Sequence, residues 1–119
     1  MKSYLKMLLV AGVFALSLAV FQEDVQADTQ YASWYGPGLE GNVTASGDIF
    51  EPYTEYTAAS PYYPFGTELL VTYGGYSVVV EVTDRGPYVA GRELDLSAVA
   101  AEEIGLTYYG SDYVDVQIL

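Results

Sequence analysis

The chain has 119 residues and a formal net charge of −12, because 16 acidic side chains face only four basic ones. It contains neither cysteine nor histidine. These absences exclude disulfides, thiol nucleophiles, zinc sites built on imidazole or thiolate, and catalytic relays that pass through histidine. Any chemistry of this chain must therefore use carboxylates, hydroxyls or arginine.

The N-terminal segment, residues 1–27, is predicted to be a secretory signal peptide. Lys2 and Lys6 precede an apolar run from 7 to 20 that a single serine interrupts, and small residues suggest cleavage before Asp28. The alternative is an uncleaved membrane anchor. No cysteine follows the apolar run, which excludes a lipoprotein anchor. We expect a protein that is secreted or held in the cell envelope, without stable membrane association after cleavage.

The remaining 92 residues, 28–119, are enough for one compact domain but too few for two. This part carries 14 acidic residues against Arg85 and Arg92, so its net charge stays at −12. Such a surface repels nucleic acid and anionic membranes, which excludes both as partners. Solubility is the simplest explanation of the charge, and we expect a monomer.

The clearest secondary-structure pattern is a β-hairpin. Residues 69–73 and 76–82 are rich in β-branched and aromatic side chains, and they flank the two-residue turn Gly74-Gly75. The run of valines at 78–80 leaves two possibilities. Either the second strand is buried on both faces, or it curls within a closed barrel.

One helix is expected in the C-terminal third. Ser97 is a suitable N-cap for a helix over 98–104, and Gly105 can close it in a left-handed conformation. The tail 113–119 alternates apolar and polar residues, which predicts a final strand that ends in the core. The sum is a mainly β domain with one short helix, and a small barrel is favoured because it leaves few open strand edges.

Three aspartates are candidates for chemistry. Asp84 follows the strongest strand and precedes Arg85-Gly86-Pro87, so a rigid turn presents its carboxylate at the rim of a sheet. The alternatives for Asp84 are an Asx-type turn or an ion pair with Arg85. Asp48 can be an ordinary turn residue, and Asp95 can simply favour the N-terminus of the helix. Because these carboxylates lie on separate turns and no loop has calcium-type spacing, we expect no metal ion and no cofactor.

Tyrosine is abundant, with 12 of its 13 copies in residues 28–119. Aromatic rings stack on the apolar faces of sugars, and tyrosine hydroxyls add hydrogen-bonding groups. The pairs Trp34-Tyr35 and Tyr62-Tyr63 lie next to turns and are the best candidates for glycan contact. Packing in the core and at exposed strand positions is the competing explanation for most of these rings.

Six short motifs occur in order along nearly the whole of residues 31–119. The motifs are Ala32-Ser33-Trp34-Tyr35-Gly36, Thr44-Ala45-Ser46-Gly47, Thr57-Ala58-Ala59, Pro64-Phe65-Gly66-Thr67, Val82-Thr83-Asp84-Arg85-Gly86-Pro87 and Gly91-Arg92-Glu93-Leu94-Asp95-Leu96-Ser97. Together they resemble the rare lipoprotein A family of double-psi β-barrel domains. The resemblance implies a six-stranded double-psi barrel with a surface groove for glycan strands. It also implies lytic transglycosylase activity on peptidoglycan, with a preference for strands stripped of their stem peptides.

The reaction that this resemblance implies cleaves the bond between N-acetylmuramic acid and N-acetylglucosamine. A carboxylic acid protonates the leaving oxygen as an oxocarbenium-like centre develops, and the sugar's own hydroxyl then attacks to give an anhydromuramyl end. Asp84 is the expected acid and, later, the expected base, with Asp48 assisting. The residues expected to contact the substrate are Ser60, Trp34, Tyr35, Arg85 and Asp95.

The chain departs from the family pattern at two polar positions. Asp48 stands where the family has glutamate, and its side chain is one methylene shorter. Ser60 stands where the family has histidine, and a serine can form a hydrogen bond but cannot carry charge. The segment between them is also one residue longer than usual. A non-catalytic module that binds glycans or loosens the wall, similar to the expansins, is therefore the alternative function. A third possibility is an inert secreted domain whose barrel is kept for a protein partner.

Overall fold

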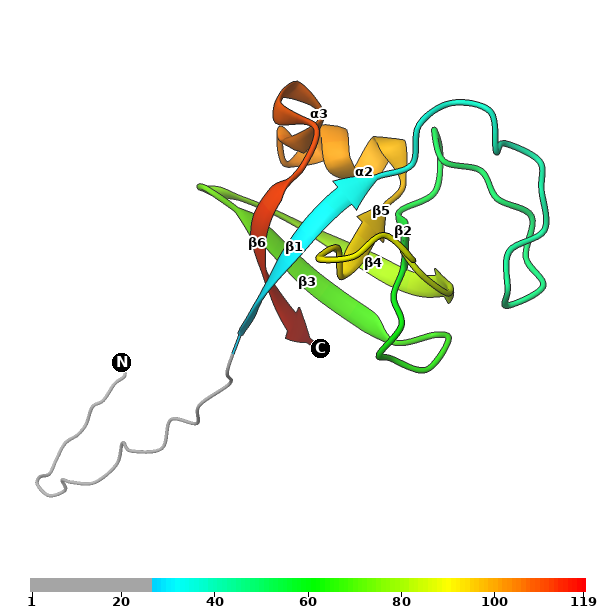
Figure 1. Cartoon of the computed structure of the whole chain (residues 1–119), viewed down its shortest axis with the longest axis horizontal. Helices are drawn as coiled ribbons and strands as arrows, with labels where there is room; N and C mark the ends of the chain where they lie inside the picture. The colour runs from blue at the N-terminus through cyan, green and yellow to red at the C-terminus, as the bar shows by residue number, and fades with distance from the viewer. Residues whose placement is uncertain (1–26) are drawn as a thin grey trace, which may run out of the picture.

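The computed structural model describes residues 27–119 (Figure 1). Apart from Ala27, the expected signal peptide lies outside the described residues. The described part consists of six strands and two short helices. The strands are β1 (Asp28–Trp34), β2 (Thr57–Ala59), β3 (Glu68–Tyr73), β4 (Tyr76–Asp84), β5 (Leu94–Leu96) and β6 (Asp112–Ile118), and the helices are α2 (Ala98–Glu103) and α3 (Leu106–Tyr109).

The six strands form a closed barrel in the order β1-β5-β2-β4-β3-β6. Two of the pairs, β1 with β5 and β2 with β4, are parallel, and the others are antiparallel. Closure pairs the main chain of every strand and leaves no open edge. The expectation of a mainly β, six-stranded barrel is confirmed.

The expected hairpin is present as β3 and β4. The two strands pair from Glu68 with Glu81 to Tyr73 with Tyr76, around the Gly74-Gly75 turn. Val78 and Val80 are buried, whereas Val79 is 43% exposed. A strand buried on both faces is therefore wrong, and the barrel accounts for the valines because alternate residues face its interior.

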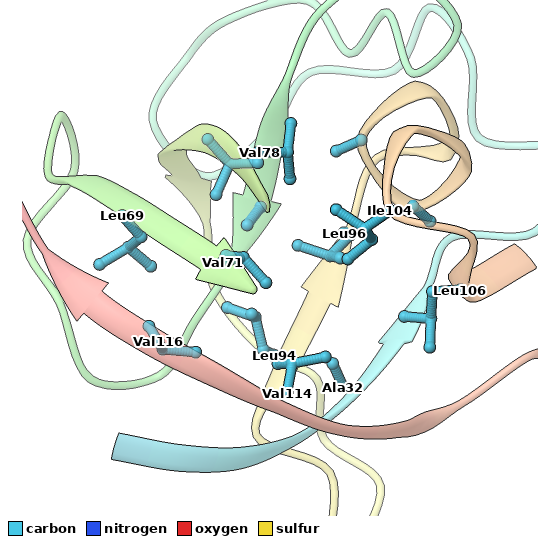
Figure 2. Close-up of a cluster of buried hydrophobic side chains, with 14 of the residues drawn as sticks. Ala32, Leu69, Val71, Val78, Leu94, Leu96, Ile104, Leu106, Val114 and Val116 are labelled. Atoms are coloured by element: carbon cyan, nitrogen blue, oxygen red, sulfur yellow. The ribbon is translucent and has the colours of Figure 1, made fainter. Parts of the chain in front are cut away.

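The core fills the barrel and continues beneath the helices (Figure 2). Each fully buried valine, leucine or isoleucine contributes roughly 1.5–3 kcal/mol relative to an exposed position. The side chains labelled in Figure 2 come from all the strands except β2 and from the helical segment: Ala32, Leu69, Val71, Val78, Leu94, Leu96, Ile104, Leu106, Val114 and Val116.

The helical segment differs from its prediction. Helix α2 ends at Glu103, and Gly105 adopts the expected left-handed conformation with φ 81°. A second helix, α3, starts directly after this glycine, so one expected helix is two short ones. Ser97 occupies the N-cap position but makes no side-chain cap, since its Oγ accepts a hydrogen bond from the main-chain N–H of Thr57 at 3.2 Å. No helix within residues 27–119 is long and apolar enough to cross a membrane.

The tail forms strand β6 as expected, with Val114 and Val116 buried. It does not end in the core, however. Ile118 and Leu119 are 58% and 62% exposed.

Candidate active site

A β-bulge at the end of β4 sets the direction of the Asp84 side chain. Val78, Val80 and Val82 face the core, and simple alternation would send residue 84 inward as well. Instead the pairing with β2 shifts, from Ala58 opposite Val82 to Ala59 opposite Asp84. The extra residue turns the Asp84 carboxyl away from the barrel interior.

Three hydrogen-bond donors hold the Asp84 carboxylate. Its Oδ1 accepts from the main-chain N–H of Ala45 at 3.0 Å and of Arg85 at 2.9 Å. Its Oδ2 accepts from the Tyr35 hydroxyl at 3.1 Å. The carboxylate is half-buried and fixed in one orientation by three groups from separate parts of the chain.

The segment that carries Ala45 is tied to the same end of β4. The main-chain N–H of Ser46 donates to the carbonyl of Thr83 at 3.0 Å, and that of Thr44 donates to the carbonyl of Asp48 at 2.8 Å. A tight turn over 44–48 therefore places its amide against Asp84. The motif Thr44-Ala45-Ser46-Gly47 thus reaches Asp84 and Thr83 through its main chain.

Tyr35 supports Asp84 from the other side. Its ring packs against Phe50 with centroids 4.6 Å apart, and its main-chain N–H donates to the carbonyl of Leu96 at 3.0 Å. Burial, followed by the charges of Asp84 and Asp95, raises the pKa of Tyr35 above its usual range. The phenol therefore stays protonated and remains a donor to Asp84.

Asp95 lies in the same row of the sheet as Asp84. Ala59 of β2 pairs with Asp84 on one side and with Asp95 of β5 on the other, and Asp95 pairs in turn with Ser33 of β1. The hydroxyl of Ser33 donates to Asp95 Oδ1 at 3.0 Å. Asp95 thus belongs to strand β5 and to this row, and its observed hydrogen-bond partner is Ser33.

Burial raises the pKa of Asp95 to about 6, and the negative charge of Asp84 adds to the effect. The hydrogen bond from Ser33 and the charge of Arg92 act in the opposite direction. Desolvation disfavours the ionised form of a carboxyl, and here it outweighs the stabilising contacts. Asp95 therefore changes protonation close to neutral pH.

The Arg85 side chain turns toward main-chain oxygens. Its Nη1 donates to the carbonyl of Ser60 at 3.2 Å and to that of Asp84 at 3.5 Å, and the guanidinium lies over the ring of Phe65, 3.9 Å from its centroid. These contacts link the end of β4 to the segment after β2. The contact of Arg85 with a glycan stays a prediction.

Ser60 is fully buried, and its hydroxyl oxygen accepts a hydrogen bond from the main-chain N–H of Tyr62 at 3.0 Å. Its own N–H donates to the carbonyl of Asp84 at 3.1 Å. In the structure Ser60 therefore supports the main chain beside the site. A direct contact between its hydroxyl and a glycan stays a prediction.

Asp48 lies on the exposed side of the same turn, where its Oδ2 accepts from the Ser46 hydroxyl at 3.2 Å. It lines a cavity of about 500 Å³ together with Glu51, Glu55 and Glu81. Within residues 27–119, no group of three or more acidic side chains is arranged to hold a metal ion. Asp48 thus neighbours the Asp84 site without joining its hydrogen bonds.

The remaining aromatic candidates divide between the core and the surface. Trp34 and Tyr63 pack against the core, and the Tyr63 hydroxyl accepts a hydrogen bond from Gln30 at 2.9 Å. Tyr62 is exposed. Ser33 and Ala59 were not predicted as site residues, although both lie inside motifs of the family. The methyl group of Ala59 carries no chemical signal.

The comparisons with known proteins agree with this architecture. A family model described as lytic transglycolase matches residues 27–118. The chain belongs to this family, and its barrel is the double-psi β-barrel that the six motifs implied.

Two curated relatives are similar to this chain in sequence. The chain is 48% identical over 91 residues to a probable endolytic peptidoglycan transglycosylase RlpA of Aquifex aeolicus, covering 75% of this chain and 40% of that protein. It is also 48% identical over 90 residues to a protein of the same name from Synechocystis, covering 74% of this chain and 28% of the relative. The chain thus spans less than half the length of these curated relatives.

Among solved structures, the Streptomyces papain inhibitor superposes with a TM-score of 0.64. The match covers 79% of this chain and 94% of the inhibitor at 19% sequence identity. At that identity the likeness concerns the fold alone.

Proposed function

We propose that this domain is a lytic transglycosylase that cleaves the bond between N-acetylmuramic acid and N-acetylglucosamine in peptidoglycan strands, leaving anhydromuramyl ends. The observation that carries the proposal is the Asp84 carboxylate, fixed by three donors at the end of β4. Its family, and relatives named as peptidoglycan transglycosylases, support the same reaction. Strands without stem peptides are the proposed substrate, and no cofactor takes part.

The contacts of Asp84 suit a base best, because all its observed partners are donors. In the ring-closing step, Asp84 would take the proton from the sugar hydroxyl that attacks the anomeric carbon. A fixed carboxylate accelerates this step because the orientation needed for proton transfer exists before the substrate binds. The proposal from sequence gives Asp84 the acid step too, with Asp48 assisting from the neighbouring turn.

The place of action follows from the substrate. Peptidoglycan lies outside the cytoplasm, so the domain would act after export, with residues 1–27 as its cleaved signal peptide. The domain would work as a monomer on glycan strands. Trp34, Tyr35, Ser60, Arg85 and Asp95 are its proposed contacts with the glycan.

The test is to incubate the full chain with peptidoglycan from which an amidase has removed the stem peptides, and to look for anhydromuramyl products by mass spectrometry. Asp84→Asn should abolish product while the fold is kept, because the amide cannot take up the proton. Asp112→Asn is the matched control, since Asp112 also binds a tyrosine hydroxyl, and it should leave product formation unchanged. Product from Asp84→Asn at the unmutated rate would overturn the proposal.

A non-catalytic, expansin-like glycan-binding module is the second candidate. It is favoured by the burial of Ser60, which leaves the histidine position of the family without a group that reaches solvent. This hypothesis predicts that the protein sediments with glycan strands that lack stem peptides and releases no soluble product. Asp84 would then hydrogen-bond the sugar without cleaving it.

A further inference from the structure

Two carboxyls flank one small residue in the site. Ala59 lies between Asp84 and Asp95 in adjacent strands, so the Cα atoms of the two aspartates are two strand spacings, or about 10 Å, apart. Ala59 itself is 1% exposed, whereas the two aspartates are half-buried and reach the surface. The register thus places one acidic group on each side of a small, covered residue.

The two carboxyls have unlike surroundings. Three donors converge on Asp84, two of them main-chain amides. Asp95 is half-buried and receives one side-chain hydrogen bond, from Ser33, and burial is the leading cause of its raised pKa. A carboxyl that loses solvent and gains few donors favours its protonated form, which is the form that an acid catalyst needs.

We propose that Asp95 is the carboxyl that protonates the leaving oxygen, and that Asp84, across Ala59, is the base. The proposal rests on the transglycosylase function proposed above and divides between two residues the work that the sequence analysis gave to Asp84. It gives this chain a second catalytic carboxyl although the family's histidine position holds serine. Asp48 is not suited to the task, because it lies on the exposed turn outside this row.

The steps balance as follows. Asp95 gives its proton to the glycosidic oxygen, the bond between that oxygen and the anomeric carbon breaks, and N-acetylglucosamine leaves with a free hydroxyl. The muramyl hydroxyl attacks the anomeric carbon, and Asp84 takes the proton of that hydroxyl. Asp95 ends ionised and Asp84 protonated, and exchange with solvent restores both.

The charges that face Asp95 define the expected pH dependence. Asp84 lies across β2, Arg92 precedes β5, Tyr35 follows β1, and Glu93 lies two residues away on the same strand edge. Only the protonated form of Asp95 is active, so kcat/KM should fall as the pH rises through about 6. Ser33→Ala removes a bond that favours the ionised form, so it should move this fall to higher pH.

The experiment measures kcat/KM for denuded strands from pH 4.5 to 8.5, together with an NMR titration of the aspartate carboxyl carbons of the free full chain. Asp95→Asn should lower kcat/KM about 100-fold or more and remove the fall near pH 6. Asparagine keeps the acceptor for Ser33, so the fold is retained. Asp115→Asn, at an exposed position of β6, is the matched control and should leave the profile unchanged.

Three results would overturn the proposal: an Asp95 carboxyl that titrates at an ordinary value near 4, an Asp95→Asn variant with an unchanged profile, or a shift of the profile to lower pH in Ser33→Ala. An unmutated protein that releases no product overturns the proposed function itself, and Asp95's part with it. Normal turnover with an unchanged Asp95→Asn profile overturns only the role of Asp95. The two failures are therefore distinguishable.

Discussion

The two ends of strand β4 carry the same chemical pair, a tyrosine hydroxyl that donates to an aspartate. At one end Tyr35 donates to Asp84 at 3.1 Å, and near the other Tyr73 donates to Asp112 at 2.7 Å. Each aspartate also accepts from the main-chain N–H of the residue that follows it. The shorter bond belongs to the pair near the β3–β4 turn, so bond length does not mark the candidate site.

What differs is the surroundings. The hydrogen bond to Asp112 raises the pKa of Tyr73 to about 12, and it lowers the pKa of Asp112. For Tyr35 burial is the leading cause, and a second carboxyl, Asp95, adds to it. The tyrosine–aspartate bond near the β3–β4 turn is a structural contact at the surface, whereas the bond at the other end lies beside a half-buried carboxyl with a raised pKa, which is typical of functional sites.

The largest expected effect is a difference between the two ends in how the free energy of unfolding depends on pH. Asp95 has a raised pKa, so its contribution to stability is fully present below 3.8 and is lost as the pH rises through about 6. The loss is on the order of 2 kcal/mol. As the pH rises from 4 to 7.5, the free energy of unfolding of Asp95→Asn, measured in urea, should therefore increase by that amount relative to the unmutated protein.

Asp112 should show the opposite sign in the same measurement. Its pKa is lowered, so its contribution is present above the ordinary value and is lost as the pH falls. Asp112→Asn should therefore lose stability relative to the unmutated protein as the pH rises from 3 to 6. Parallel curves for the two variants would mean that Asp95 and Asp112 do not differ in the direction of their pKa shifts.

The next effect in size concerns the two tyrosines. Tyr35→Phe removes one of the three donors to Asp84, and we expect it to lower kcat about tenfold with little change in KM. The same change should lower the free energy of unfolding by about 1 kcal/mol. Tyr73→Phe, the matched change, should leave kcat unaltered. Equal losses in the two variants would show that the Tyr35 bond does not position Asp84.

The smallest effect concerns the contacts that brace each end. Phe65→Leu removes the ring beneath the Arg85 guanidinium and should cost about 0.5–1 kcal/mol in thermal unfolding. At the hairpin end, Ser77→Ala breaks the exposed hydroxyl pair with Thr72 and should cost less than Phe65→Leu. A larger loss for Ser77→Ala would mean that the site end is the less firmly braced of the two.

The fold could be predicted where the pattern was long enough. Strands β3, β4 and β6 have six to nine residues each. The glycine turn of the β3–β4 hairpin and the alternation of apolar and polar residues in β6 are visible in the sequence. Strands β2 and β5 have three residues each, too few to show a period. Their place in the barrel depends on pairing with distant strands, which no local pattern contains.

The candidate site was predicted in part. Asp84 was expected at the end of its strand, and the structure places it there. Asp95 was expected to contact the glycan, but its place opposite Ala59, in the same row as Asp84, was not predicted, because that place depends on strand pairing. Ser33 and Ala59 lie beside the two aspartates because of the register of the strands, and the register between strands that are distant in sequence depends on tertiary structure.

The bulge at Thr83 and Asp84 makes the candidate site depend on the length of the chain and not only on its chemistry. Since side chains in a strand alternate with a period of two, deletion of Thr83 would rotate the carboxyl of Asp84 into the barrel, away from Ala45 and Tyr35. The deletion of one codon would thus inactivate the site although the codons of all the proposed site residues remained. In related barrels, a gap at this position of an alignment would therefore indicate a loss of activity even where all the site residues are present.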